Sequence, residues 1–159
     1  MNSDMTPNKV IIDANLLTLW IVGQVSEDLV PKCRRTRQYT VDDYLVLANY
    51  LTRFITVIIT PNIATEVSNL IGVLKDDHLI KARTILAGGF EAWTEVYFKS
   101  VAAKDIPEYM RLGLTDAAIL LSVSRETEVL TDDFDLYRVL TKRGIIVTNF
   151  THLRTAGMI

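Results

Sequence analysis

Four acidic side chains stand where a parallel sheet would bring them to one edge. Asp13 directly follows the apolar run Val10–Ile12, and Asp133 comes shortly after another apolar run. Glu66 lies in a short helix predicted after the second strand, and Asp116 lies at the start of a later helix. In an open parallel sheet, ligands bind beside the carboxyl ends of the strands. We therefore expect the four carboxylates to converge.

Carboxylates grouped in this way are suited to binding a hard divalent cation. Without a cation, like charges a few ångströms apart repel, and at least one group stays protonated. Mg²⁺ and Mn²⁺ take oxygen ligands, and a pair of such ions can activate a water and stabilise the leaving oxygen of a phosphodiester. Asp13, Asp116 and Asp133 are predicted to hold the ion directly or through water. Glu66 would complete the site or orient the attacking water, so all four are predicted catalytic residues and metal ligands.

Each acid also has a purely structural interpretation. Asp116 and Asp133 fall in the first turn of predicted helices, where free backbone N–H groups favour a carboxylate. Glu66 taken alone is typical of a solvated helix residue. Asp13 is harder to explain in this way, because it closes an apolar strand where an unpartnered charge would be costly. The expected convergence of the four is what favours a functional site.

Neighbouring residues could support or replace these ligands. Asn15 and Thr131 are predicted to orient ligands or water through hydrogen bonds. Asp132 and Asp135 compete with Asp133 for the last position, and the spacing after Thr131 favours Asp133. The two histidines of the chain lie away from the acids in the sequence, so a zinc hydrolase is a poor fit.

A short basic segment is the candidate for contacts with RNA phosphates. Its members are Lys32, Arg34, Arg35 and Arg37. Such contacts would position RNA without reading its sequence. The net charge of −2 does not favour a nucleic-acid binder, although the four proposed ligands account for part of the negative charge. The alternative interpretation of the segment is a solvent-exposed loop with no role in binding.

Alternating strands and helices must position these residues, and this alternation predicts a parallel α/β sheet. The predicted strands are Lys9–Asp13, Val57–Thr60, Val129–Thr131 and Ile145–Val147. The predicted helices are Ala14–Val22 ended by Gly23, a helix from Thr40 to Leu51 with Asp43 in a capping box, one opening at Pro61, Asp76–Ala87 interrupted by Gly88 and Gly89, Phe90–Ala103, Thr115–Ser124 capped by Thr115, and Asp133–Arg143 closed by a left-handed Gly144. The pattern on either side of Gly88 and Gly89 fits two helices or one kinked helix. Residues 24–39 are expected to be a loop.

Length and composition predict a single domain over residues 1–159. The chain has 159 residues, of which 49% are hydrophobic, enough for one well-buried core. The one cysteine, Cys33, excludes an intramolecular disulfide and suits a reducing compartment. The polar start lacks the apolar segment of a signal peptide, and the longest apolar runs are too short to span a bilayer. We therefore expect a soluble, cytoplasmic protein.

With these residues in view, the sequence resembles the PIN-domain family. The family's four acidic motifs correspond in order to Ile11–Asn15, Glu66–Asn69, Leu112–Ala117 and Thr131–Leu136. The first carries Asp-x-Asn, the second a glutamate followed by valine and a small residue, the third a Leu-Gly-Leu-Thr run before its aspartate, and the fourth a Thr-x-Asp pattern. Residues 144–153 also resemble the family's ending, so the resemblance covers nearly the whole chain.

The resemblance implies a three-layer α/β/α fold with a mostly parallel sheet of about five strands, and metal-dependent endoribonuclease activity with Mg²⁺ or Mn²⁺. It also implies the toxin of a toxin–antitoxin pair, with an antitoxin protein as partner and a homodimer as assembly. One departure weakens the toxin implication: the separation of Asp13 and Glu66 is wider than in a compact toxin, and the extra length lies in residues 23–55. A catalytically inactive PIN-like module that binds RNA or protein is the main alternative.

Two other enzyme classes with similar sheets fit less well. A phosphatase of the haloacid dehalogenase type requires Asp-x-Asp after its first strand, and here the third residue is Asn15. A response-regulator receiver requires an acidic pair after the first strand and a lysine after the last, whereas the pair Asp132 and Asp133 lies near the end of this chain.

Overall fold

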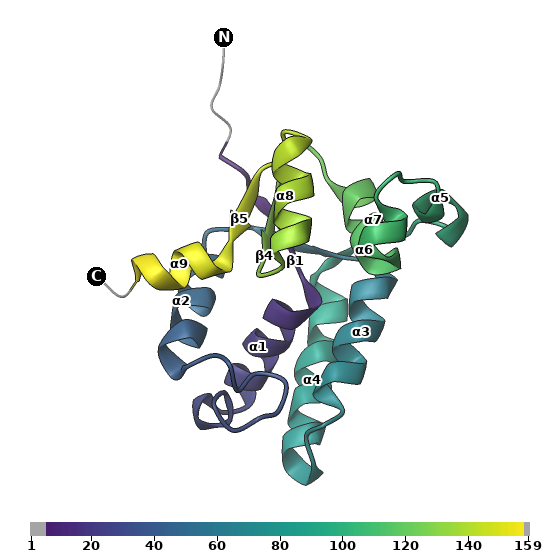
Figure 1. Cartoon of the computed structure of the whole chain (residues 1–159). Helices are drawn as coiled ribbons and strands as arrows, with labels where there is room; N and C mark the ends of the chain where they lie inside the picture. The colour runs from purple at the N-terminus through teal and green to yellow at the C-terminus, as the bar shows by residue number, and fades with distance from the viewer. Residues whose placement is uncertain (1–5, 158–159) are drawn as a thin grey trace.

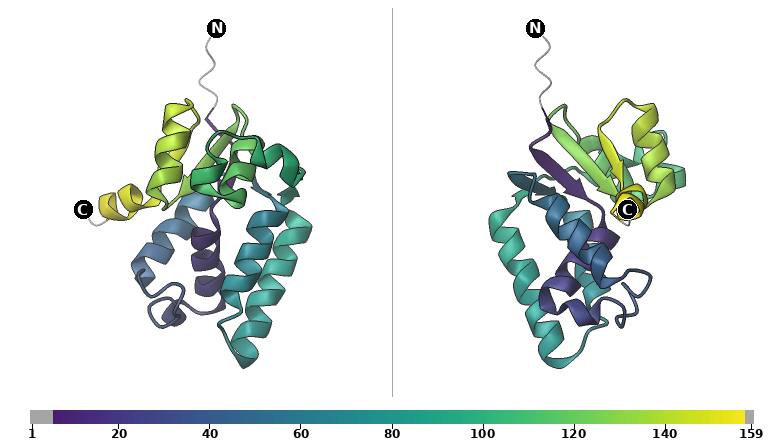
Figure 2. Two further views of the ribbon diagram at one scale, coloured as in Figure 1. Left: turned by 45° about the vertical axis from the view of Figure 1, so that its right-hand side comes forward. Right: turned by 90° about the vertical axis from the view of Figure 1, so that its left-hand side faces the viewer.

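The fold is built on a parallel sheet of five strands in the order β3-β2-β1-β4-β5. A computed structural model describes residues 6–157 of the chain. The strands are β1 (Lys9–Ile12), β2 (Thr56–Ile59), β3 (Thr94–Glu95), β4 (Thr127–Thr131) and β5 (Val147–Asn149). Helices flank the sheet, with α8 on one side of the strands and α4 on the other (Figure 2). The predicted α/β class with a five-stranded parallel sheet is confirmed.

Ten helical segments connect or follow these strands within the described residues (Figure 1). They are α1 (Ala14–Val25), the 3₁₀ turn η1 (Glu27–Leu29), α2 (Val41–Leu51), α3 (Pro61–Ile71), α4 (Asp76–Ala92), α5 (Ser100–Lys104), α6 (Tyr109–Leu112), α7 (Leu114–Ser122), α8 (Phe134–Lys142) and α9 (Phe150–Ala156). In residues 6–157, no helix combines the length and the apolar character needed to cross a membrane.

The core forms around the central strand β1 and the helix that follows it. Val10, Ile11 and Ile12 are buried, as expected for a strand covered on both faces. Helix α1 is apolar on most sides, from Leu16 to Val22, because it packs against α2, α3 and α4 together. The rigid junction between β1 and α1 is where Asp13 lies.

Several local predictions are confirmed. Thr40 and Asp43 form the reciprocal capping box at the start of α2. Pro61 occupies the first turn of α3, where its missing N–H is not needed. Gly144 has a φ of 70°, the left-handed conformation that ends a helix.

Two predicted helix ends at glycine are wrong. Helix α1 continues through Gly23 to Val25, and α4 continues through Gly88 and Gly89 to Ala92. A Cβ on Gly23 would lie 2.1 Å from the ring of Tyr44. Gly23 therefore permits the close packing of α2 on α1 instead of ending the helix.

The predicted helix Phe90–Ala103 is also wrong, because Thr94–Glu95 pairs with β2 as the edge strand β3 and only Ser100–Lys104 is helical after it. Helix α7 begins at Leu114 after Gly113, so Thr115 is not its cap. The last strand is Val147–Asn149 instead of Ile145–Val147. The predicted loop 24–39 contains the end of α1 and the turn η1, and its remaining residues are irregular.

Candidate active site

Asp13 is a buried carboxylate held at the end of the central strand. Its Oδ1 accepts a hydrogen bond of 2.9 Å from the Leu16 backbone, which caps α1. Its Oδ2 accepts bonds from the Thr131 hydroxyl and, at 2.8 Å, from the backbone N–H of Asp132. Burial raises the pKa of Asp13, and these donors act in the opposite direction. The side chain is therefore fixed in orientation.

Thr131 joins Asp13 to Asp133. The register that pairs Ile12 with Leu130 places the ends of β1 and β4 side by side. The Thr131 hydroxyl donates to Asp13 and accepts a 3.0 Å bond from the backbone N–H of Asp133. Asp133 in turn caps α8 through a 2.9 Å bond from Leu136. Thr131 thus lies between the two acids, where an orienting role was expected.

Asp116 and Glu66 complete the acidic edge from helices α7 and α3. The pKa of Asp116 is raised to about 7, first by burial and then by the charges of Asp133, Asp13 and Glu66. The charges of the three other acids therefore act on Asp116, although burial is the larger cause of its raised pKa. Neither Asp116 nor Glu66 accepts a side-chain hydrogen bond within residues 6–157, so their oxygens are available to a ligand.

The acids are near one another but do not form a ready-made metal cage. Across the described part of the chain, no three Asp, Glu, His or Cys side chains lie close enough to hold a metal ion as they stand. The donor set itself consists of carboxylate oxygens, which suit Mg²⁺ and Mn²⁺. Glu66 and Asp133 are exposed at the edge of the group.

A scan of the sequence against protein-family models finds no match, and no curated protein matches it significantly.

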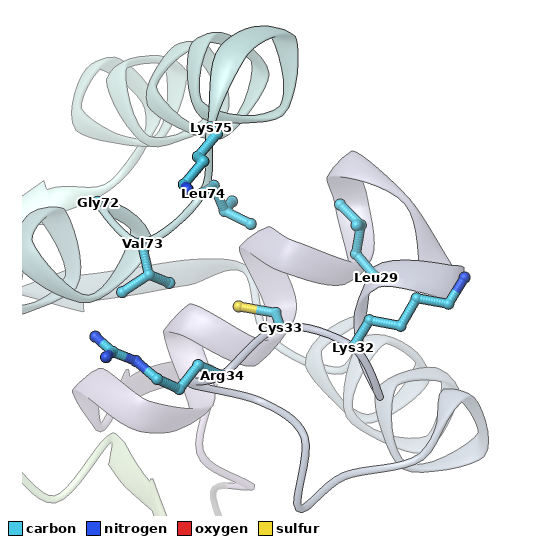
Figure 3. A pocket seen from close by; sticks show the side chains of 8 residues that line it. All are labelled: Leu29, Lys32, Cys33, Arg34, Gly72, Val73, Leu74 and Lys75. Carbon is cyan, nitrogen blue, oxygen red and sulfur yellow. The ribbon is translucent and has the colours of Figure 1, made fainter.

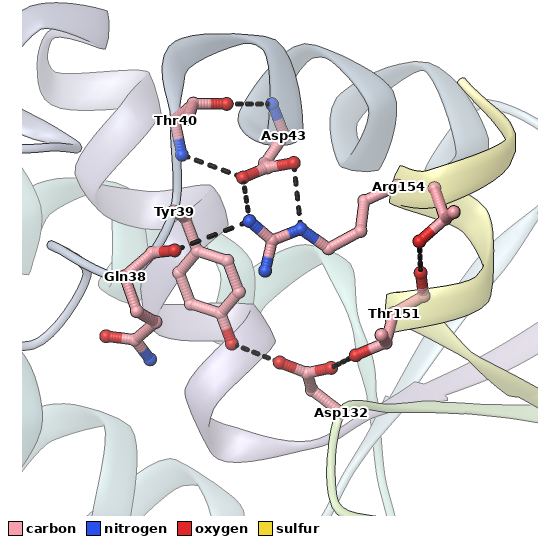
Figure 4. Close-up of polar contacts among 8 residues, drawn as sticks. Gln38, Tyr39, Thr40, Asp43, Asp132, Thr151 and Arg154 are labelled. Carbon is pink, nitrogen blue, oxygen red and sulfur yellow. Dashed lines mark hydrogen bonds and ion pairs between the residues drawn. The ribbon is translucent and has the colours of Figure 1, made fainter. Parts of the chain in front are cut away.

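The two acids that competed with Asp133 are bound elsewhere. Asp132 accepts hydrogen bonds from Tyr39 at 2.7 Å and Thr151 at 2.6 Å (Figure 4). Asp135 forms an ion pair of 2.7 Å with Arg111. Asn15 is exposed at the start of α1 and makes no side-chain hydrogen bond to the acids in the described structure.

A polar network behind Asp13 was missed by the sequence reasoning. Tyr39 binds Asp132, whose backbone N–H holds Asp13, and α9 contributes Thr151 and Arg154 to the same network (Figure 4). The Arg154 guanidinium pairs with the buried carboxylate of Asp43. Tyr39 and Asp132 are 93 positions apart in the chain, and Arg154 and Asp43 are 111 apart. No local sequence pattern predicts such contacts.

The basic segment follows η1 in the chain. Lys32 and Arg34 line a hollow of about 650 Å³ between the segment after η1 and the turn from α3 to α4. Their side chains point to opposite sides of the buried Cys33, and Lys75 enters from the facing turn (Figure 3). Arg35 and Arg37 are exposed. The structure does not gather these four cations into one site, and their contact with RNA stays a prediction.

Proposed function

We propose that this chain is a metal-dependent endoribonuclease that hydrolyses RNA phosphodiester bonds at the edge formed by Asp13, Glu66, Asp116 and Asp133. One observation carries the proposal: the charged form of Asp116 is disfavoured first by burial and then by the charges of Asp133, Asp13 and Glu66. A divalent cation stabilises such a group of charges. The resemblance to the PIN-domain family supports RNA as the substrate.

The residues fit Mg²⁺ or Mn²⁺ by their chemistry. Mg²⁺ usually takes one or two protein carboxylates and keeps several waters, so a site without three preassembled ligands is compatible with it. Asp116 and Glu66 have free oxygens, and Asp133 has one oxygen outside its capping bond. When bound, the ion would activate water and offset charge on the phosphate.

The chain's own residues would position the ligands and orient water. Hydrogen bonds from Thr131 and from the backbone of Asp132 hold the side chain of Asp13 in one orientation. Glu66, exposed and free of protein partners, is placed to orient water. The acids repel an RNA phosphate, and a bound cation would offset this repulsion at the cleavage site.

A second candidate is the catalytically inactive PIN-like module that binds RNA or protein. The lack of three close metal ligands among residues 6–157 favours it. The toxin role, the antitoxin partner and the homodimer rest on the resemblance alone.

The deciding experiment is cleavage of labelled single-stranded and structured RNAs in Mg²⁺, Mn²⁺ or EDTA. Asp116→Asn should reduce metal-dependent cleavage by about 100-fold or more, because loss of even an outer partner of a metal ligand costs about 10–100-fold. Asp135→Asn is the matched control, since that neighbouring acid pairs with Arg111, and it should cut at the parent rate.

Equal cleavage by the parent and Asp116→Asn would refute the assignment of the site. A parent protein that neither cuts RNA nor binds Mn²⁺ by calorimetry would support the second candidate.

A further inference from the structure

A polar hollow of about 370 Å³ lies directly beside Glu66, between α3 and the start of α7. Its walls are Pro61, Asn62, Thr65, Glu66, Asn69 and Thr115. On α3, positions 62, 65, 66 and 69 follow helical spacing and form one face, while Ile63, Val67 and Ile71 face the core. The hollow therefore meets the acidic edge at Glu66, while its other walls carry no charge.

The chemistry of this hollow suits a neutral polar ligand. Its lining contains no Lys, Arg or His, so it lacks the charge that would hold a phosphate. Each Asn amide offers both donors and an acceptor. The side chains of Asn62, Thr65, Asn69 and Thr115 make no hydrogen bond within residues 6–157, which leaves these groups free for a ligand.

A second hollow of about 420 Å³ continues the first over the surface of α3 towards α4. The two share Pro61, Thr65 and Asn69, and Phe90 of the second hollow is 46% exposed. The other residues that line only the second hollow are Ala64, Ser68 and the acidic Glu95. Together they form a groove that begins at Glu66 and ends at an exposed aromatic ring. Figure 1 shows α3 lying between α7 and α4 along this path.

We propose that this groove, which we call the α3 groove, binds nucleobases of single-stranded RNA next to the scissile phosphate. Asn69, shared by both hollows, reads one base by hydrogen bonds, and Phe90 stacks on a neighbouring base. Sequence-specific RNA recognition commonly combines these two contacts on unpaired bases. Each hollow lies within the size range of small-molecule sites, about 300–1,000 Å³. The inference rests on the proposed ribonuclease function, because that function places the phosphate at the acids.

Binding can be measured apart from cleavage in the Asp116→Asn background. Short fluorescent single-stranded RNAs of each of the four bases are titrated and followed by anisotropy. Phe90→Ala should weaken binding about 10-fold, the usual effect of losing one stacking contact. Asn69→Ala should reduce the difference in affinity among the four RNAs. In cleavage-competent protein, Asn69→Ala should also broaden the choice of base beside the cut.

Two control substitutions remove comparable groups away from the groove. Ile80→Ala removes an exposed apolar side chain from the same helix as Phe90, and Asn49→Ala removes an exposed amide from α2. Added to the Asp116→Asn background, each control substitution should leave the affinity for every RNA unchanged.

The proposal fails if Phe90→Ala and Asn69→Ala bind like these controls, or if the background binds none of the RNAs. Failure of the nuclease is a separate result: a parent that cuts no RNA, with binding that still depends on Phe90 and Asn69, supports the groove and removes the catalytic function.

Discussion

At the scale of single residues, Asp13 and Asp116 show how position decides what a carboxylate does. Asp13 is buried but surrounded by donors from Leu16, Thr131 and Asp132. Asp116 has no such donors, and burial together with the charges of three other acids raises its pKa to about 7. Asp13 is held in place, and Asp116 is the group whose negative charge a ligand must stabilise.

The raised pKa of Asp116 predicts a pH-dependent cost to stability. Its folded pKa of about 7 lies above the unfolded value of 3.8, so the folded state binds the proton more tightly. The unfavourable contribution is absent below the unfolded pKa, grows as the pH rises, and is complete above the folded pKa. In EDTA, Asp116→Asn should therefore raise the free energy of unfolding by about 1–2 kcal/mol near pH 8, a figure discounted for partial exposure.

Urea denaturation of both proteins at several pH values tests this prediction. The gain should shrink as the pH falls towards about 5, because the parent carboxyl then becomes protonated in the folded state. A gain that is the same at every pH would mean that the amide stabilises the fold for another reason.

At the scale of elements, the effect of a helical glycine on stability depends on which side chains pack against it. Gly23 in α1 is covered by the ring of Tyr44 from α2, whereas Gly88 in α4 has nothing within 4 Å of an added Cβ. Both glycines lie inside helices, where Ala is intrinsically favoured by about 1 kcal/mol. The two positions separate intrinsic helix preference from packing.

Gly23→Ala should destabilise the protein by about 2 kcal/mol, because overpacking against Tyr44 outweighs the better helix preference. Gly88→Ala should stabilise it by about 0.5–1 kcal/mol. Chemical denaturation of the two variants beside the parent measures both values. If Gly23→Ala also proved stabilising, the close contact between α1 and α2 would have to be relaxed in solution.

At the scale of the whole molecule, helix α9 contacts and stabilises the segment that leads into α2. Arg154 pairs with Asp43, whose side chain is only 2% exposed, and also donates to the backbone carbonyl of Gln38. Thr151 and Tyr39 meet at Asp132, beside Asp13 (Figure 4). The long segment between Gly23 and Ile55 thereby contributes directly to the support of the acidic edge.

Arg154→Ala should lower the free energy of unfolding by about 3 kcal/mol, because it leaves the carboxylate of Asp43 buried without its cation. Arg83→Ala is a suitable control, since Arg83 is exposed on α4 and forms no ion pair in the described residues. Thermal or urea unfolding compares the two. A similarly small loss of stability in Arg154→Ala and Arg83→Ala would show that water or another donor reaches Asp43 when Arg154 is absent.

Local patterns in the sequence were sufficient for the parallel α/β class, for the strand ending at Asp13 and for the caps at Thr40 and Gly144. These features depend on side-chain periodicity and backbone preference, which act over a few neighbouring residues. The acids could be named for the same reason, since each follows a local strand or helix signal.

Tertiary structure alone decided the edge strand β3, the continuation of α1 and α4 through glycine, and the contact of Tyr39 with Asp132. Thr94 becomes a strand residue because β2 offers a partner at Ile58, and Gly23 remains helical because Tyr44 packs on it. The pKa of Asp116 likewise depends on charges from three other segments. The energies of such features come from groups far apart in the chain, and their values are set only when folding brings those groups together.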